Sequence, residues 1–291
     1  MALTALETIF LVAGGMSFFD ALLHAFGTAG TGGFSTKAAS VGAFNSLYVE
    51  MVISVFMLLF SVNFNLYYLL LIGRVKDVLK NEELRWFLAI VLFSVLTIAV
   101  NISSMYGSFT TALRHAFFNV STIISTTGFG TVDFNLWPQY SKWLLILLMF
   151  IGACAGSTGG GLKVSRVVML LKSAEAELKK MIRPRSVTRV QLEGKRVETG
   201  AVHAVNTFFV MYLMILLVCT LLIAVDGFDM ETNFTGALAC LSNIGPGMSL
   251  VGPTGNYSLF SAFSKIVLSL AMLIGRLEIY PILLLFNRHT W

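Results

Sequence analysis

Three short runs of small and polar residues carry the most specific chemistry in the sequence. The runs are residues 125–130 (STTGFG), an upstream relative at 30–35 (GTGGFS) and a weaker downstream relative at 242–247 (SNIGPG). Each run lies between apolar segments. Small side chains let backbone carbonyls point inward, where they can replace the hydration shell of an ion, and glycine permits the dihedral angles that this requires. The pattern therefore predicts a pore that is lined by backbone.

The chemistry of the runs favours a monovalent cation. A ring of carbonyls without fixed charge suits such an ion, whereas a divalent cation usually needs a ring of carboxylates. None of the runs contains Asp or Glu. The short helices that precede the runs would add negative potential from their C-terminal dipoles. The predicted ion-binding residues are Thr31, Gly32, Gly33, Thr126, Thr127, Gly128, Asn243, Ile244 and Gly245.

The composition places the chain in a lipid bilayer. The sequence is 56% hydrophobic and only 12% charged, whereas a soluble protein carries about 25% charged residues. Its net charge of +5 comes from basic residues clustered between apolar segments, which indicates membrane orientation and not nucleic-acid binding. The cysteines Cys154, Cys219 and Cys240 stand singly, so we expect packing roles and no metal site apart from the transported ion.

The elements that must position the runs form a repeated unit of span, short helix, run and span. We expect all-α pore units at 1–72 (with its first helix truncated), 86–171 and 201–291, joined by loops at 73–85 and 172–200. Both loops are basic, which predicts that they are cytoplasmic and that the runs face outward. The predicted spans are 47–72, 86–102, 143–171, 202–225 and 259–286, and the predicted short helices are 20–29, 111–125 and 234–242.

The apolar segment 143–171 is interrupted by glycines. A continuous helix would be about 43 Å long, beyond a hydrocarbon core of about 30 Å, and residues 152–161 (GACAGSTGGG) disfavour a helix. The break falls near the bilayer midplane, where irregular backbone should face a cavity. A kink for close helix packing is the alternative. A phosphate-binding loop lacks the necessary spacing.

Arg276 is the second unusual feature, because apolar residues flank it on both sides. An arginine at the midplane is costly and marks a pathway by default. Glu278 is the alternative partner, although positions i and i+2 diverge on a helix. Lys163 and Arg166 lie near the end of the broken helix, where we expect their side chains to snorkel to the interface.

Five ordered motifs together resemble the Trk/Ktr superfamily of potassium uptake proteins. The motifs are residues 32–36 (GGFST), 126–130 (TTGFG), 156–161 (GSTGGG), 243–247 (NIGPG) and 275–278 (GRLE). The ending, with Trp291 soon after the last span, resembles the Trk branch of bacteria. The family fold has four units of helix, re-entrant pore helix with filter loop, and helix around one pore, as in potassium channels. This chain matches the second, third and fourth, so we expect a truncated product or part of a gene.

The resemblance implies potassium transport through a carbonyl filter, in a multi-pass protein of the bacterial inner membrane. It also implies a homodimer, a cytoplasmic nucleotide-binding regulatory subunit and no cofactor. In the family, the broken-helix loop and the matching arginine form a gate beneath the filter, and we expect the arginine to raise the barrier to cations. The implied gate residues are Gly156, Ser157, Thr158, Gly159, Gly160, Gly161 and Arg276.

Two other functional classes remain to be weighed. A sodium- or proton-coupled secondary cation transporter would also use broken helices at the midplane. Its repeats would be inverted, whereas these repeats are parallel and each carries a run. A membrane enzyme would need catalytic groups at depth, but His24, His115 and His203 stand alone. We therefore expect no enzyme.

Overall fold

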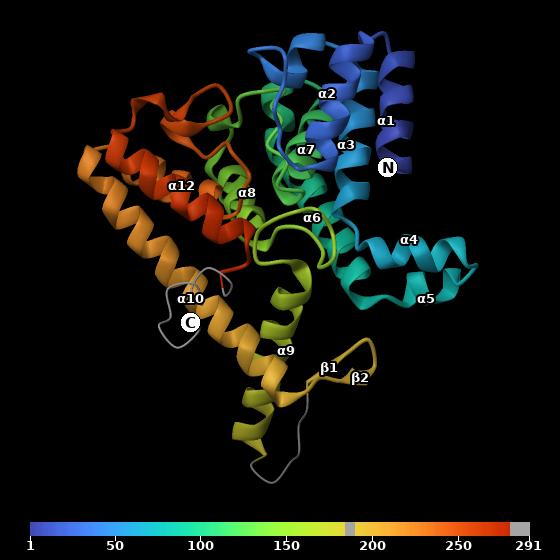
Figure 1. The fold of residues 1–291 in the computed structure, drawn as a ribbon, viewed down its shortest axis with the longest axis vertical. Coiled ribbons are helices and arrows are strands. Elements are labelled where there is room, and N and C mark those ends of the chain that lie inside the picture. Colours follow the sequence, from blue (N-terminus) through green and yellow to red (C-terminus); the bar gives the residue numbers. More distant parts are fainter. Residues whose placement is uncertain (184–189, 280–291) are drawn as a thin grey trace, which may run out of the picture.

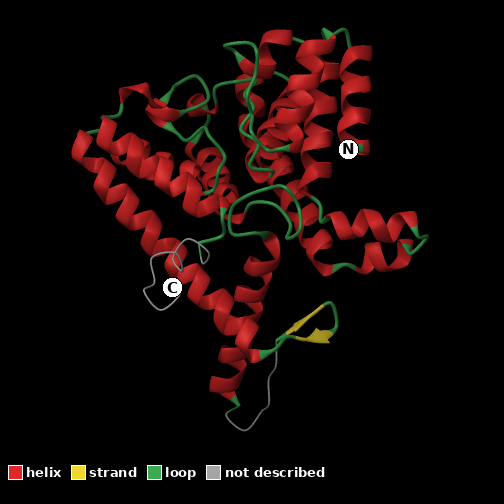
Figure 2. Ribbon diagram, viewed as in Figure 1, coloured by secondary structure: helices red, strands yellow, loops and turns green. Residues whose placement is uncertain are grey.

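The computed structural model describes residues 1–183 and 190–279, and the described part is predominantly helical (Figures 1 and 2). Its helices are α1 (Ala2–Ala13), α2 (Phe18–Ala29), α3 (Leu47–Ser61), α4 (Phe64–Leu71), α5 (Val75–Lys80), α6 (Glu82–Tyr106), α7 (Phe109–Ile124), α8 (Gln139–Ile151), α9 (Val164–Ile182), α10 (Thr199–Ile223), α11 (Met230–Leu241) and α12 (Ala262–Arg276). The strands β1 (Gln191–Leu192) and β2 (Lys195–Arg196) form one antiparallel hairpin.

Polar side chains define where many of these helices begin. The first backbone N–H groups of a helix have no partner within it, and a preceding Ser, Asn or Asp can accept a hydrogen bond from them. The capping residues observed here are Ser17 for α2, Ser46 for α3, Asn63 for α4, Asn81 for α6, Asp229 for α11 and Ser261 for α12.

The helices form three groups around the middle of the molecule. The first holds α1, α2 and α3, the second holds α6, α7 and α8, and the third holds α10, α11 and α12. Figure 1 shows α8 between α7 and α12, and α9 leaving this body alongside the start of α10. The irregular chain between α8 and α9 lies at the centre of the view (Figure 2).

Apolar packing holds the short helices inside these groups. Residues 118–124 at the C-terminal end of α7 are buried, including Phe118, Val120, Ile123 and Ile124. The surfaces of the long helices are apolar as well, with Leu217 and Leu221 of α10 among many exposed hydrophobic side chains. Exposed apolar faces on this scale are expected where lipid is the solvent.

In residues 1–183 and 190–279, two helical segments, Glu82–Tyr106 and Thr199–Asp226, are long and apolar enough to cross a membrane. The segment 47–72, expected as one full span, consists of α3 and α4, which are bent by 91° at the break between them. The Asn63 side chain accepts a hydrogen bond from the N–H of Asn65 at 2.9 Å and starts the new helix. A residue that caps a helix start offers the backbone an alternative to continuing the previous helix.

Two further boundaries differ from the sequence predictions. The segment expected as loop 172–200 begins with the last turns of α9, where Glu175 and Lys179 form an i,i+4 ion pair at 2.5 Å, and it ends with the hairpin. The last span was expected over 259–286. Its helix α12 ends at Arg276, and residues 280–286 lie outside the described residues.

A bidentate ion pair fastens the short helix α7 to α3. The Nε and Nη2 atoms of Arg114 each donate to a different oxygen of Glu50, both at 2.7 Å, and Glu50 is only 4% exposed. Two parallel charge-assisted hydrogen bonds fix geometry as well as adding energy.

We expect Glu50→Ala to lower the unfolding free energy by about 1–3 kcal/mol, because Arg114 would lose both hydrogen bonds to this carboxylate. The measurement is thermal unfolding in detergent, followed by tryptophan fluorescence. Glu175→Ala removes a carboxylate from an exposed pair and is the matched control, with an expected change below about 0.5 kcal/mol. Equal melting temperatures for the two variants would contradict the role assigned to the Glu50–Arg114 pair.

Candidate functional site

The three runs share one backbone conformation. Their second residues, Thr31, Thr126 and Asn243, have left-handed φ angles of 53°, 58° and 56°. The glycines two positions later in the runs, Gly33, Gly128 and Gly245, have φ angles of 64°, 89° and 104°. Non-glycine residues adopt positive φ only uncommonly, so the same departure at matching places is a property of the repeated unit.

The ends of the short helices bring each run into this conformation. In α7, the N–H of Thr126 donates to the carbonyl of Ile123, and the N–H of Thr127 donates to that of Thr122. The equivalent i→i−3 and i→i−5 hydrogen bonds follow α2 and α11. The longer bond matches the 6→1 bond of a Schellman motif. All three helices therefore end at their runs, with the negative ends of their dipoles toward them.

The runs lie side by side, in contact through backbone. A Cβ atom placed on Gly33 would stand 2.2 Å from the carbonyl oxygen of Thr127, and one on Gly128 would stand 2.0 Å from that of Ile244. No side chain fits at either position. The order of contact is thus the run after α2, then that after α7, then that after α11.

Among the described residues, the third run has no such neighbour on its far side. A Cβ on Gly245 would meet no atom within 4 Å. A cavity of about 690 Å³ lies there, between the run that follows α11 and the run that follows α2. Its wall includes Thr31 and Gly32 on one side and Asn243 and Ile244 on the other. The three runs therefore enclose an axis that is open on one side.

Polar and aromatic side chains support the runs from behind. The hydroxyls of Ser125 and Thr127 are 2.7 Å apart, and Tyr257 donates from its hydroxyl to the carbonyl of Gly245 at 2.7 Å. Tyr212 and Ser242 share a hydrogen bond of 2.7 Å between their hydroxyls. These contacts fix the runs without placing a charged group in them.

The chain between α8 and α9, residues 152–163, is termed the intramembrane loop and lies against all three runs. The N–H of Gly160 donates to the hydroxyl of Thr126 at 2.7 Å, and the hydroxyl of Thr31 lies 3.2 Å from the carbonyl oxygen of Thr158. A Cβ on Gly160 would stand 2.4 Å from the carbonyl oxygen of Ser242. The structure thus brings the predicted gate residues together with the predicted ion-binding residues.

Arg276 joins the same cluster. Its Nη1 atom lies 3.1 Å from the carbonyl oxygen of Thr158 and 3.3 Å from the hydroxyl of Thr31. The sequence predicted an apolar helix that continues on both sides of Arg276. In the described residues, the helix ends at Arg276 itself. The side chain stands at the end of α12 and borders the cavity beside Asn243.

Glu278 binds different cations. Its carboxylate pairs with Lys163 at 3.0 Å and with Arg166 at 2.6 Å, and the Arg166 guanidinium lies 4.2 Å from the centre of the Phe208 ring. The sequence predicted snorkelling for Lys163 and Arg166 and did not predict that both pair with Glu278. Sequence reasoning missed this cluster because the partners are more than 100 residues apart. The one available signal was an acid two residues after Arg276.

The charged groups around the site lie outside the runs. At the start of α11, partial burial opposes ionisation of Asp229, but hydrogen bonds from Thr232 outweigh it and lower the pKa of this carboxyl. Among residues 1–183 and 190–279, there is no group of three His, Cys, Asp or Glu side chains that could hold a metal ion. The polar atoms within the runs themselves belong to backbone, hydroxyl and amide groups.

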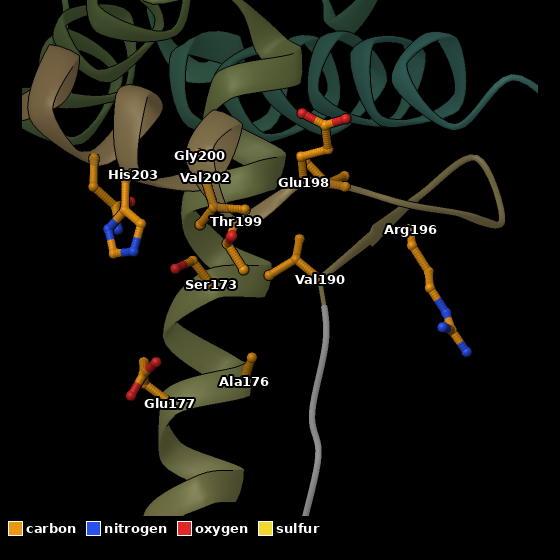
Figure 3. A pocket seen from close by; sticks show the side chains of 12 residues that line it. Ser173, Ala176, Glu177, Val190, Arg196, Glu198, Thr199, Gly200, Val202 and His203 are labelled. Atoms are coloured by element: carbon orange, nitrogen blue, oxygen red, sulfur yellow. The ribbon is translucent and has the colours of Figure 1, made fainter.

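A separate cavity of about 790 Å³ lies far from the runs, beside α9 and the start of α10. Figure 3 shows Ser173 and Glu177 projecting from α9, with Thr199 and His203 at the start of α10. It contains none of the predicted site residues.

Comparison with known proteins identifies the family of this chain. The TrkH family model, described as a cation transport protein, matches residues 7–290. The Trk system potassium uptake protein TrkH of Salmonella typhimurium (strain LT2) is 38% identical over 280 residues, which cover 95% of this chain and 58% of that protein. TrkG of Escherichia coli (strain K12), also a Trk system potassium uptake protein, is 33% identical over 283 residues, or 95% of this chain and 57% of that protein.

A solved structure agrees as well. The crystal structure of the potassium transporter TrkH from Vibrio parahaemolyticus superimposes with a TM-score of 0.91 at 35% identity, over 100% of this chain and 63% of that one. This confirms the predicted helical membrane fold. The chain spans less than two thirds of the length of each relative named here. It belongs to the TrkH family of cation transport proteins, a family of transporters and not of enzymes, as the sequence predicted.

Proposed function

We propose that the protein forms part of a potassium pathway, with the ion passing along the axis that the three runs enclose. The observation that carries this proposal is the matching backbone of the runs, with left-handed residues at Thr31, Thr126 and Asn243 and direct contact between neighbouring runs. A ring of backbone carbonyls can replace the hydration shell of an ion. The relatives described above are named as potassium uptake proteins.

The electrostatics support a cation with a single charge. The C-terminal ends of α2, α7 and α11 all meet the runs, and each contributes a partial negative charge there. The runs add carbonyl dipoles but no carboxylate. A ring of carboxylates suits a divalent ion, whereas a neutral ring of carbonyls suits a monovalent one.

A fourth run would complete the ring. The open side beside Gly245 faces the run at Thr31 and Gly32 across the cavity of about 690 Å³. The relatives are longer than this chain. We infer that a fourth unit of the same kind fills this side in the assembled transporter.

The intramembrane loop supports a gate below the runs. Thr158 and Gly160 contact Thr31 and Thr126 directly, and Arg276 adds a positive charge at the same level. A cation leaving the runs would therefore meet both a steric and an electrostatic barrier. Opening requires the loop and Arg276 to move away from the axis.

The protein's surroundings follow from its charge pattern. The basic segment that includes Lys172, Lys179, Lys180 and Arg183 favours a cytoplasmic location for the hairpin side, with the runs facing outward across a bacterial inner membrane. This basic surface suits docking of a nucleotide-binding regulatory subunit, and two copies of the transporter would form a homodimer. Coupled transport with sodium or protons is the alternative mechanism, and uptake that collapses with either gradient would favour it.

Gly128→Ala should reduce potassium uptake about tenfold or more and lower the preference for potassium over sodium. The new Cβ would strike the Ile244 carbonyl, and an alanine at φ 89° is strained by about 1–3 kcal/mol. Uptake of both ions would be measured in cells that require potassium. Gly130→Ala is the matched control, because its Cβ would meet no atom closer than 3.7 Å. Unchanged uptake and selectivity in Gly128→Ala would reject the assignment of the runs.

Arg276→Ala should raise ion flux at rest by several-fold, because the barrier below the runs loses its charge and its hydrogen bonds to Thr158 and Thr31. The flux is measured as potassium efflux from loaded proteoliposomes. Arg74→Ala removes an arginine from an exposed pair and serves as the control. A flux through Arg276→Ala equal to that through the parent protein would contradict the role proposed for Arg276.

A further inference from the structure

A single buried carboxylate bridges the two ends of the intramembrane loop. Glu83, in the first turn of α6, is only 6% exposed. Its Oε1 atom accepts hydrogen bonds from the N–H of Ala155 at 2.7 Å and from the N–H of Ser165 at 3.1 Å. Ala155 lies where the chain leaves α8, and Ser165 lies in the first turn of α9. One oxygen atom thus holds together two points that are ten positions apart in the chain.

The donors at this oxygen are groups that the broken helix leaves without helical partners. The first N–H groups of α9 cannot bond within the helix, and its N-terminus carries a partial positive charge. A carboxylate suits both features, since hydrogen bonds to an ionised acceptor are roughly twice as strong as neutral ones. Two backbone bonds, Leu162 N–H to Phe150 and Val164 N–H to Ala153, close the base of the loop as well.

Glu82, the residue before Glu83, binds to the hairpin and not to the loop. Glu82 pairs with Lys172 of α9, and its other oxygen accepts from the N–H of Glu193 at 3.1 Å, between β1 and β2. Lys172 also donates to the carbonyl of Gln191 at 2.8 Å. Asn81, which caps α6, donates to the carboxylate of Glu193. The hairpin and the loop are therefore attached to consecutive residues of one helical turn.

We propose that Glu83 is a positioning residue that holds the intramembrane loop against the runs, and that the turn Asn81–Glu83 couples the loop to the hairpin. A displacement of the hairpin would pull on Glu82, shift the start of α6 and weaken the two hydrogen bonds at Glu83. The loop would then separate from Thr126 and Thr31. The interpretation of this movement as gating rests on the function proposed above. The attachment of the loop and the hairpin to the turn Asn81–Glu83 does not depend on that function.

The hairpin lies largely at the surface, with Gln191, Glu193 and Arg196 exposed and Leu192 packed against the core. It borders the cavity of about 790 Å³ beside α9, and Figure 3 shows the Arg196 side chain directed away from that helix. In the described part of the chain, its ties to the body include the contacts of Gln191 and Glu193 given above. A partner that grips the exposed hairpin could therefore act on the turn without entering the membrane.

Native cysteines provide a direct readout of the loop. Cys154 lies at its base and is buried, while Cys219 of α10 and Cys240 of α11 are buried elsewhere. Opening of the loop exposes Cys154 alone, whereas global unfolding exposes all three. The rate of labelling of each thiol by N-ethylmaleimide, measured by mass spectrometry on the whole protein in detergent, therefore separates the two events.

We expect Glu83→Ala to raise the labelling rate of Cys154 about fivefold or more, with little change at Cys219 and Cys240, because both hydrogen bonds are lost. Glu83→Gln should stay near the parent rate, since its amide oxygen can accept from the same N–H groups. Glu82→Ala should give a smaller increase at Cys154. Glu175→Ala, on an exposed pair, is the control and should leave all three rates unchanged.

The outcomes that overturn the proposal are distinct. A parental Cys154 rate in folded Glu83→Ala protein refutes the positioning role. A parallel rise at all three cysteines shows that Glu83 only stabilises the fold. A parental rate in Glu82→Ala refutes the coupling to the hairpin. Labelling needs no ion flux, so each result stands whether or not the uptake experiments support potassium transport.

Discussion

Backbone that leaves a helix inside a membrane must find hydrogen-bond partners within the protein, and this constraint organises the chain. The constraint is clearest at two breaks in the helices, one between α3 and α4 and one between α8 and α9. Where α3 ends, the carbonyl of Ser61 accepts from the N–H of Cys154, and the N–H of Phe64 donates to the carbonyl of Gly156. The bend between α3 and α4 and the break between α8 and α9 therefore satisfy each other. They form one structural feature, although they lie about 90 residues apart.

The same constraint gives the site its electrostatic character. Three helix ends with partial negative charge converge on the runs, which makes the adjacent space favourable for a cation. Arg276 occupies part of that space, and its guanidinium bonds to the Thr158 carbonyl and lies near the Thr31 hydroxyl. An arginine in lipid is costly, whereas converging helix dipoles and backbone carbonyls favour its positive charge. The features that would attract a transported ion thus also stabilise the arginine below it.

The sequence predicted the parts of the site that have local signals. Each short helix and its run could be read from an apolar segment followed by small residues and glycine, and Gly152–Gly161 marked a break. The sequence could not show the contacts between residues that lie far apart in the chain. Asn63 looks like an ordinary polar residue within an apolar segment. The structure shows that it caps α4, next to Phe64, whose N–H donates to the carbonyl of Gly156. Glu278 likewise pairs with cations contributed by another helix.

The position of Glu82 and Glu83 shows how local helix geometry can serve two distant elements. Consecutive helical residues point about 100° apart, because a turn contains 3.6 residues. One carboxylate therefore reaches Lys172 and the hairpin, while the next reaches Ala155 and Ser165 at the loop. Both acids also lie at the helix N-terminus, where negative charge is favoured. A short rigid turn is thus sufficient to connect a surface hairpin with a loop that lies against the runs, without any long chain of side-chain contacts.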